Sequence, residues 1–162
     1  PILVWFHAGM LLYGSGSDPV YDADSLARRG DLVVVTVNYR LGVLGFLYHP
    51  VLLDPATGGC GHRGVLDQPA ALQWVRDRAE RLGGDPENVT ICGSAAGATS
   101  VAVLATSPSR RGLFRRAIVQ STAPFTTPAE DAGEAAAALA HAAGGSLDEP
   151  ESVDELIQAA RE

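Results

Sequence analysis

One stretch of the chain, residues 89–107, constrains the fold more than any other. An apolar, β-branched run ends at Cys92, and Gly93, Ser94, Ala95, Ala96 and Gly97 follow at once, before a run of small and apolar residues that ends at Pro108. A short apolar run that passes through glycine directly into a helical segment is typical of a buried strand, a tight turn and a helix. The small residues at 96–98 let that helix lie close to a sheet. The stretch therefore predicts a layered α/β fold.

Strands are predicted in four short apolar segments. These are Ile2 to Phe6, Leu32 to Val37, Val89 to Cys92, and Ala117 to Val119 with its flanks. None of the four alternates between apolar and polar residues, which is typical of parallel strands buried on both faces. Because helical segments separate the runs, we expect a mostly parallel sheet flanked by helices.

Helices are predicted at residues 22–29, 67–82 and 96–107. In the second of these, the apolar residues recur at helical spacing. They are Ala71, Leu72, Val75, Ala79 and Leu82. Gly83 and Pro86 end this helix, because glycine supplies a left-handed cap and proline prevents continuation.

The charge of the chain is uneven. The whole chain of 162 residues carries a net charge of −7. Residues 1–124 hold 11 Arg and 10 acidic residues, whereas residues 125–162 hold one Arg and nine acidic residues. We expect residues 1–124 to be the core of one domain, and residues 125–162 to be an acidic helical segment of the same domain with helices at 129–143 and 151–162.

Composition and sequence pattern also limit the classes of partner that are expected for this chain. A nucleic-acid partner is not expected, because no basic stripe is present. No apolar run is long enough for a membrane span, and no leader precedes the apolar start, so any targeting segment is expected upstream. The compartment, cytoplasmic or secreted, stays open. The four histidines lack the spacing of metal ligands, and neither a metal nor a cofactor is expected.

Four segments together resemble the type-B carboxylesterase/cholinesterase family of α/β-hydrolases. The first is WFHAGM at residues 5–10 with GSGS at 14–17. The second is VVVTVNYRLG at 33–42 with GFL at 45–47. The third runs from GVLDQ at 64–68 through ALQWV at 71–75 to GGDPENVT at 83–90. The fourth is GSAAG at 93–97, followed by GLFRRAIVQS at 112–121. Their order and spacing make a chance match implausible.

The resemblance implies a partial α/β-hydrolase fold, truncated at both ends, and a site for carboxylic ester hydrolysis. In this family the motif G-x-S-x-G forms a nucleophile elbow, and backbone N–H groups form an oxyanion hole. Position by position, the nucleophile falls on Ala95, where serine is expected, and the oxyanion donors fall on Gly9, Met10 and Ala96. The family's catalytic acid and histidine are expected beyond Glu162, outside this chain.

Substitutions in two of the motifs point to lost chemistry. Alanine at position 95 has no lone pair for attack on an ester. Where the family has three glycines this chain has Ala8, Gly9 and Met10, so that Met10 is expected either to fill the acyl pocket or to strain the loop. Ser94 is expected to point away from the tip of the turn and to bond locally.

The remaining side chains are expected to have supporting roles, and more than one function agrees with the sequence. His7 is expected to orient the oxyanion loop, and Trp5 and Trp74 to pack in the core. The sequence predicts an inactive relative of serine carboxylesterases, whose ancestral partner is a small carboxylic ester. A non-catalytic binding or adhesion module with a protein partner, or a gene fragment without function, are the alternatives.

Overall fold

The structure is a computed structural model, and it describes all residues except 49–52, 56–58, 123–126, 143–156, 159 and 161–162. The chain forms two compact units. The first contains residues 1–39 and 65–124, and the second contains residues 40–64 and 125–162. The first unit carries the sheet and every residue of the candidate site.

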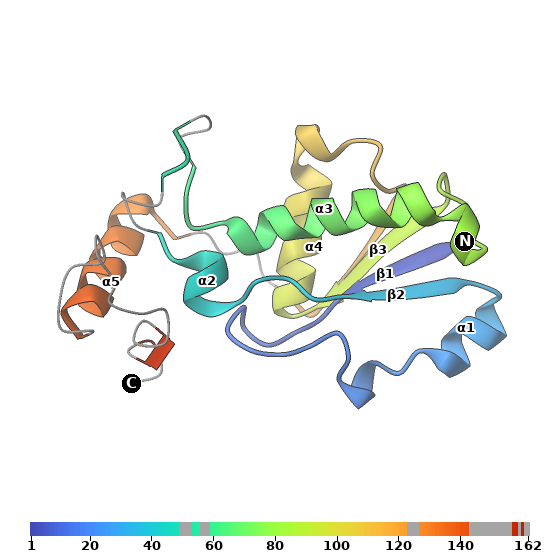
Figure 1. Cartoon of the computed structure of the whole chain (residues 1–162), viewed down its shortest axis with the longest axis horizontal. Helices are drawn as coiled ribbons and strands as arrows, with labels where there is room; N and C mark the ends of the chain where they lie inside the picture. Colours follow the sequence, from blue (N-terminus) through green and yellow to red (C-terminus); the bar gives the residue numbers. More distant parts are fainter. Residues whose placement is uncertain (49–52, 56–58, 123–126, 143–156, 159, 161–162) are drawn as a thin grey trace. The chain divides into compact units, whose positions relative to one another are not determined.

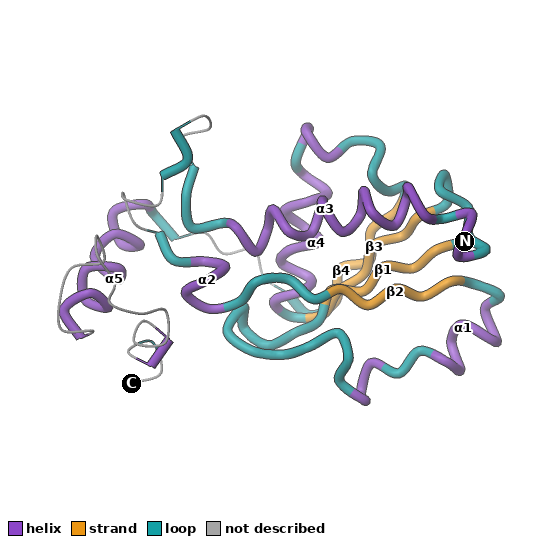
Figure 2. Tube along the Cα trace, in the orientation of Figure 1, coloured by secondary structure: helices purple, strands orange, loops and turns teal. Residues whose placement is uncertain are grey.

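A four-stranded parallel sheet forms the centre of the first unit (Figures 1 and 2). Its strands are β1 (Ile2–Phe6), β2 (Val33–Val37), β3 (Val89–Ser94) and β4 (Arg116–Gln120), in the order β2-β1-β3-β4. All four lie on the apolar runs of the sequence. The expected fold class, an α/β arrangement with a parallel sheet flanked by helices, is therefore confirmed.

One face of the sheet makes the core. Ile2, Val4 and Phe6 of β1 are fully or almost fully buried, and they pair in register with Val89, Ile91 and Gly93 of β3. Paired residues of parallel strands point to the same side, so these six share one face. Helix α4 (Ala96–Thr106) packs on β1, β3 and β4.

The opposite face corrects the expectation that the strands are buried on both sides. Burial alternates along β1, because Leu3 and Trp5 are only partly covered. Strand β4 is exposed at all five residues, and Ile118 and Val119 keep 44% and 46% of their surface exposed. Among the described strands β4 has one neighbour, β3, and its apolar sequence alone could not reveal its place at the edge.

The helices follow the predictions with shifted ends. The predicted helix at 67–82 is α3 (Arg63–Arg78), which starts four residues earlier, contains Pro69, and is followed by the 3-10 turn η3 (Glu80–Leu82). The predicted helix at 22–29 is α1 (Asp24–Gly30), preceded by the 3-10 turn η1 (Pro19–Tyr21). A further 3-10 turn, η4 (Pro108–Arg110), follows α4. No helix in the described part of the chain has the length and apolar character to cross a membrane.

Helices α2 and α5 lie in the described part of the second unit. Helix α2 (Gly42–Phe46) was not predicted, because five residues with glycine at two positions give little periodic signal. Helix α5 (Ala129–Ala142) matches the predicted helix at 129–143. The predicted helix at 151–162 lies mostly outside the described residues.

Candidate active site

A sharp bend joins β3 to α4, and we call residues 93–97 the elbow. Ala95 stands at its tip, is exposed, and has φ 50° and ψ −116°. Non-glycine residues occupy this backbone region only under strain, of the order of 1–3 kcal/mol. Two contacts hold the bend: the Ala95 N–H donates to the Gln120 carbonyl at 3.0 Å, and the Ala95 carbonyl accepts the Thr99 N–H at 3.0 Å.

Close backbone approach explains the two glycines of the elbow. A Cβ built on Gly93 would lie 2.4 Å from the carbonyl carbon of Gly97. A Cβ built on Gly97 would lie 2.1 Å from the Phe6 carbonyl oxygen and 2.7 Å from that of His7. Because all of these neighbours are backbone atoms, only glycine lets the first turn of α4 rest on the ends of β3 and β1.

The loop after β1, residues 8–13, is the candidate oxyanion loop. Three consecutive residues have positive φ: Gly9 at 123°, Met10 at 57° and Leu11 at 65°. The Gly9 carbonyl accepts the N–H groups of Leu12 and Tyr13, which closes the turn. Glycine is required at position 9, since a Cβ there would lie 1.9 Å from the Tyr13 carbonyl oxygen.

Met10 occupies a conformation that suits glycine better. Its φ of 57° is left-handed, which costs an L-residue roughly 1–2 kcal/mol. Its side chain is 69% exposed, so it fills no pocket formed by the described residues. The left-handed backbone of Met10 agrees with the expectation of a strained loop, and the expectation of a filled acyl pocket stays a prediction.

Side chains that follow β1 and β2, together with one from η1, anchor this loop. The buried His7 ring donates from Nδ1 to the Ala8 carbonyl at 2.6 Å and stacks on Tyr39 at 4.6 Å between centroids. The Tyr39 hydroxyl donates to the His7 carbonyl at 2.8 Å, and the Tyr21 hydroxyl accepts the Ala8 N–H at 3.2 Å. Burial, with a smaller effect of Tyr21, raises the pKa of Tyr39 to about 12. The contacts of His7 agree with the orienting role expected for it.

The loop and the elbow lie at the same edge of the sheet. Strands β1 and β3 are parallel neighbours with Phe6 paired to Gly93, so both segments leave the carboxyl ends of adjacent strands. Among the described residues, none accepts a hydrogen bond from the amides of Gly9, Met10 or Ala96. These amides remain available to an external acceptor.

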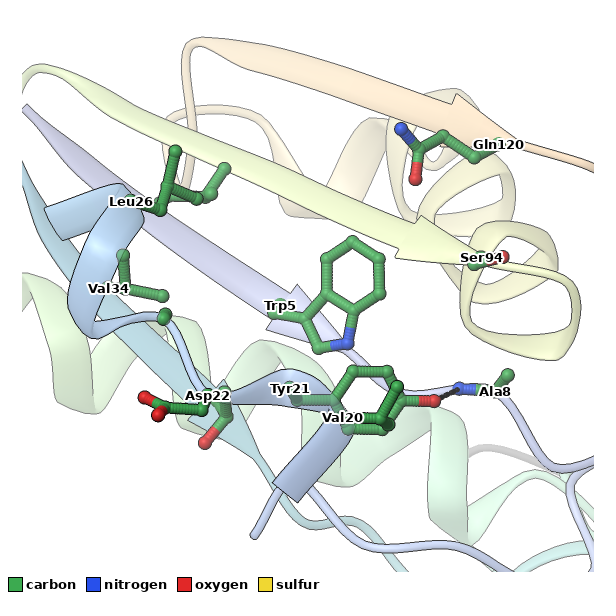
Figure 3. A pocket seen from close by; sticks show the side chains of 12 residues that line it. Trp5, Ala8, Val20, Tyr21, Asp22, Leu26, Val34, Ser94 and Gln120 are labelled. Carbon is green, nitrogen blue, oxygen red and sulfur yellow. Dashed lines mark hydrogen bonds between the residues drawn. The ribbon is translucent and has the colours of Figure 1, made fainter. Parts of the chain in front are cut away.

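Ser94 lies in a different environment from Ala95. It borders a cavity of about 380 Å³ on the less buried face of the sheet, together with Trp5, Tyr21 and Gln120 (Figure 3). No histidine is among the residues that line the cavity, so the lining offers Ser94 no imidazole base. The sequence predicted that Ser94 points away from the tip; it gave no sign of the cavity.

The tryptophans depart from the expected core packing. Trp74 is 45% exposed, and the Arg78 guanidinium lies 4.8 Å from the centre of its ring. Trp5 lines the cavity and contacts Tyr21, with 5.5 Å between ring centroids. Helical spacing placed Trp74 beside the buried positions without showing that it lies at their margin.

The side chains that anchor the oxyanion loop and the turn after it were not predicted. Tyr39 and Asn38 were noted only as parts of a motif, and Tyr21 was not singled out. Asn38 accepts the Gly16 N–H through Oδ1 at 2.8 Å. A polar motif directly after a buried strand was the available signal. The described residues contain no cluster of His, Cys, Asp and Glu that could hold a metal ion.

Comparison with known proteins decides the family. The family described as the carboxylesterase family matches residues 1–162. The chain belongs to the carboxylesterase family. It is 42% identical to the para-nitrobenzyl esterase of Bacillus subtilis and 46% identical to cholinesterase 1 of Branchiostoma lanceolatum, in both cases over 99% of this chain.

Solved carboxylesterase structures share the fold. A carboxylesterase of Geobacillus stearothermophilus superposes with a TM-score of 0.90 at 41% identity, over 99% of this chain and 36% of that chain. The juvenile hormone esterase of Manduca sexta gives 0.87 at 32% identity, over 99% and 32% of the two chains. This chain spans 33% of the B. subtilis relative and 44% of the B. lanceolatum relative.

Proposed function

We propose that this carboxylesterase-family chain descends from carboxylic ester hydrolases and that its elbow is chemically silent. The observation that carries the proposal is Ala95, which occupies the strained tip of the elbow with a methyl side chain. The backbone bend that displays a nucleophile is present, and the nucleophilic atom is not. The names of the relatives, para-nitrobenzyl esterase among them, suggest a small carboxylic ester as the ancestral substrate.

Acyl transfer at an elbow requires an oxygen or sulfur that loses a proton to a base while it attacks the carbonyl carbon. Ala95 supplies neither atom. The nearest hydroxyl in sequence, that of Ser94, borders the cavity on the sheet face. The hydroxyl of Thr99 contacts the Ala95 carbonyl at 3.3 Å and the Thr122 hydroxyl at 2.6 Å. Ser94 and Thr99 therefore lie in environments different from the tip of the elbow, and neither hydroxyl replaces the missing serine in the proposed scheme.

The amides of Gly9, Met10 and Ala96 are the proposed remnants of an oxyanion hole. These amides have no acceptor among the residues that the structure describes, which supports this role, as does the parallel pairing of β1 and β3, which brings both segments to one edge. Such donors stabilise the negative charge that develops on an ester oxygen. Loss of a triad nucleophile lowers kcat by about 10⁶ in a well-studied protease, with about 10³–10⁴ over water retained by the remaining groups.

Ester turnover tests the proposal. The protein, expressed as its gene encodes it, is mixed with p-nitrophenyl acetate and butyrate, and release of p-nitrophenol is followed from the first milliseconds. We expect no burst and a slow linear rate. The Ala95→Ser variant tests the nucleophile alone, and Ala95→Gly is its matched control because it keeps the bend without an oxygen. A burst from the unmodified protein, equal to its molar amount, contradicts the proposal.

A second candidate is a hydrolase-like module that binds without turnover. The exposed side chains of Met10, Leu12 and Tyr13 favour it, since 69%, 62% and 63% of their surfaces face solvent beside the unoccupied amides. Titration calorimetry with butyrate tests for a carboxylate ligand, and affinity capture tests for a protein partner. Lack of saturable binding to either removes this candidate.

The third alternative from the sequence, a non-functional fragment, is tested by folding. A cooperative thermal transition and a monodisperse solution contradict it. A broad transition with aggregation supports it, because unpaired sheet edges promote association between chains.

A further inference from the structure

A buried chain of hydrogen bonds joins α3 to the start of α4. Gln68 is fully buried in α3, and its side-chain Nε2 donates to the Ser100 hydroxyl at 2.9 Å. Ser100, only 3% exposed, in turn donates to the Ala96 carbonyl at 3.2 Å. The contacts therefore run from the middle of α3 to the residue that directly follows the tip of the elbow.

The direction of each bond is fixed by chemistry. A backbone carbonyl only accepts, so the single hydroxyl proton of Ser100 goes to Ala96. Ser100 must then accept from Gln68, which requires the NH₂ group of that side chain and sets the orientation of its amide. Neither side chain can reverse its role without losing a bond in the buried space between the helices.

This chain of bonds fixes one side of the elbow, and the sheet fixes the other. Strand β3 is held by pairing to β1 and β4 on both sides, and the Ala95 N–H is bound to the Gln120 carbonyl. The first turn of α4 is held to α3 by Gln68 and Ser100. The single residue between these two anchored segments, Ala95, has to take up the change in direction.

We propose that Gln68 and Ser100 are positioning residues of the elbow, which hold residue 95 in its strained conformation and thereby set the direction of the Ala96 N–H. They act through the backbone and do not touch the position of an ester. This role concerns the geometry of the bend and does not depend on whether the elbow is active.

A thermodynamic cycle tests the role. Glycine adopts φ 50° and ψ −116° without the strain that alanine carries, so Ala95→Gly should raise the melting midpoint of the protein by about 2–4 °C. The gain is then measured again in the Gln68→Met and Ser100→Ala backgrounds. Gln68→Met keeps the side-chain volume and removes the amide, which makes it the primary background.

If the two residues maintain the strain, their removal lets Ala95 relax. The rise in melting midpoint caused by Ala95→Gly is then less than half of the rise measured in the unmodified protein. Matched controls are Gln73→Met, an exposed amide on α3, and Thr106→Ala, which removes a hydroxyl bonded at 2.9 Å to the Ala102 carbonyl at the far end of α4. Both should keep the full gain.

Loss of stability alone does not support the proposal, because any buried residue produces it. The decisive measurement is non-additivity with Ala95→Gly, because a residue that only adds stability leaves the rise in melting midpoint caused by Ala95→Gly unchanged. A full gain in the Gln68→Met and Ser100→Ala backgrounds overturns the proposal. Faster amide hydrogen exchange at Ala96 in Gln68→Met, with unchanged exchange at Ile91 in β3, is the second result that we expect.

Discussion

A Cβ atom placed on Gly97 would lie 2.1 Å from the carbonyl oxygen of Phe6. The helix that starts at the elbow therefore rests directly on the end of the central strand, and the contact joins backbone to backbone. No rotamer change can relieve such a contact. It sets the distance between the elbow and the loop that follows β1.

The first prediction concerns this contact. Gly97→Ala should lower the free energy of unfolding by about 3 kcal/mol, since overpacking against rigid atoms is among the larger mutational costs. Urea denaturation measures the loss. Gly112→Ala is the matched control, because Gly112 has φ 87° but nothing within 4 Å of a built Cβ, and it should cost only about 1 kcal/mol. Equal losses at the two positions would show that packing at Gly97 has no special weight.

A second prediction concerns strain in the oxyanion loop. Met10→Gly should raise the free energy of unfolding by about 1 kcal/mol, because Met10 has φ 57° and glycine adopts this region freely. Met10→Ala is the control, since it removes the exposed side chain and keeps the strain. Thermal unfolding of the two variants separates these effects. A variant Met10→Gly no more stable than Met10→Ala contradicts the assignment of strain.

The third prediction uses the buried phenol of Tyr39. Burial raises its pKa to about 12 in the folded protein, above the ordinary tyrosine value of 10.0. The unfolded chain therefore releases the proton first, and the stability contributed by the protonated phenol is complete below pH 10 and is lost as the pH rises toward 12. Urea denaturation between pH 8 and pH 11.5 should show a steeper decline for the unmodified protein than for Tyr39→Phe.

Tyr39→Phe should also be less stable at neutral pH, by about 1–3 kcal/mol, because the buried His7 carbonyl loses its hydroxyl donor. Tyr13→Phe is the control, since Tyr13 is 63% exposed, and it should match the unmodified protein in both respects. Parallel pH profiles for Tyr39→Phe and the unmodified protein would contradict the prediction.

A fourth prediction separates the two contacts of Arg76. Its guanidinium donates to the Glu87 carboxylate at 2.6 Å and to the Pro86 carbonyl at 2.8 Å. Arg76→Ala should cost about 1 kcal/mol, and Glu87→Gln about 0.5 kcal/mol or less, because a pair with a 76% exposed carboxylate is screened by solvent. The effect of Glu87→Gln should shrink further in 1 M NaCl. Equal costs for the two variants would show that the Pro86 contact adds nothing.

The sequence predicted the sheet well because its strands are short apolar runs between clear breaks. The run at 2–6 became β1 without a shift of either end, and the prediction for 89–92 fell short of β3 by two residues. Gly93 and Ser94 read as turn residues, yet they continue the ladder because they pair with Val119 and Gln120 of β4. Local propensity at these two positions is overridden by a neighbouring strand.

Burial was harder to predict than secondary structure. The apolar residues Ile118 and Val119 of β4 and the apolar–aromatic Trp74 of α3 read as core, and all three are more than 40% exposed. Apolar character indicates that a side chain can be buried. Whether it lies at the edge or the centre of a sheet depends on strand order, which a single apolar run does not encode. The motif residues were easier to predict, because Gly93 and Gly97 are required by local backbone contacts.

The bend at residue 95 is maintained by main-chain contacts and by groups on other residues, and the side chain at its tip takes no part in them. The turn therefore tolerates a small non-glycine side chain at position 95, at the cost of backbone strain. Cysteine, selenocysteine or an unnatural residue with a small reactive head could be installed there by a single codon change, with the presenting scaffold already in place. The consequence is a scaffold that already presents position 95 at the tip of the bend and could carry a reactive group introduced there.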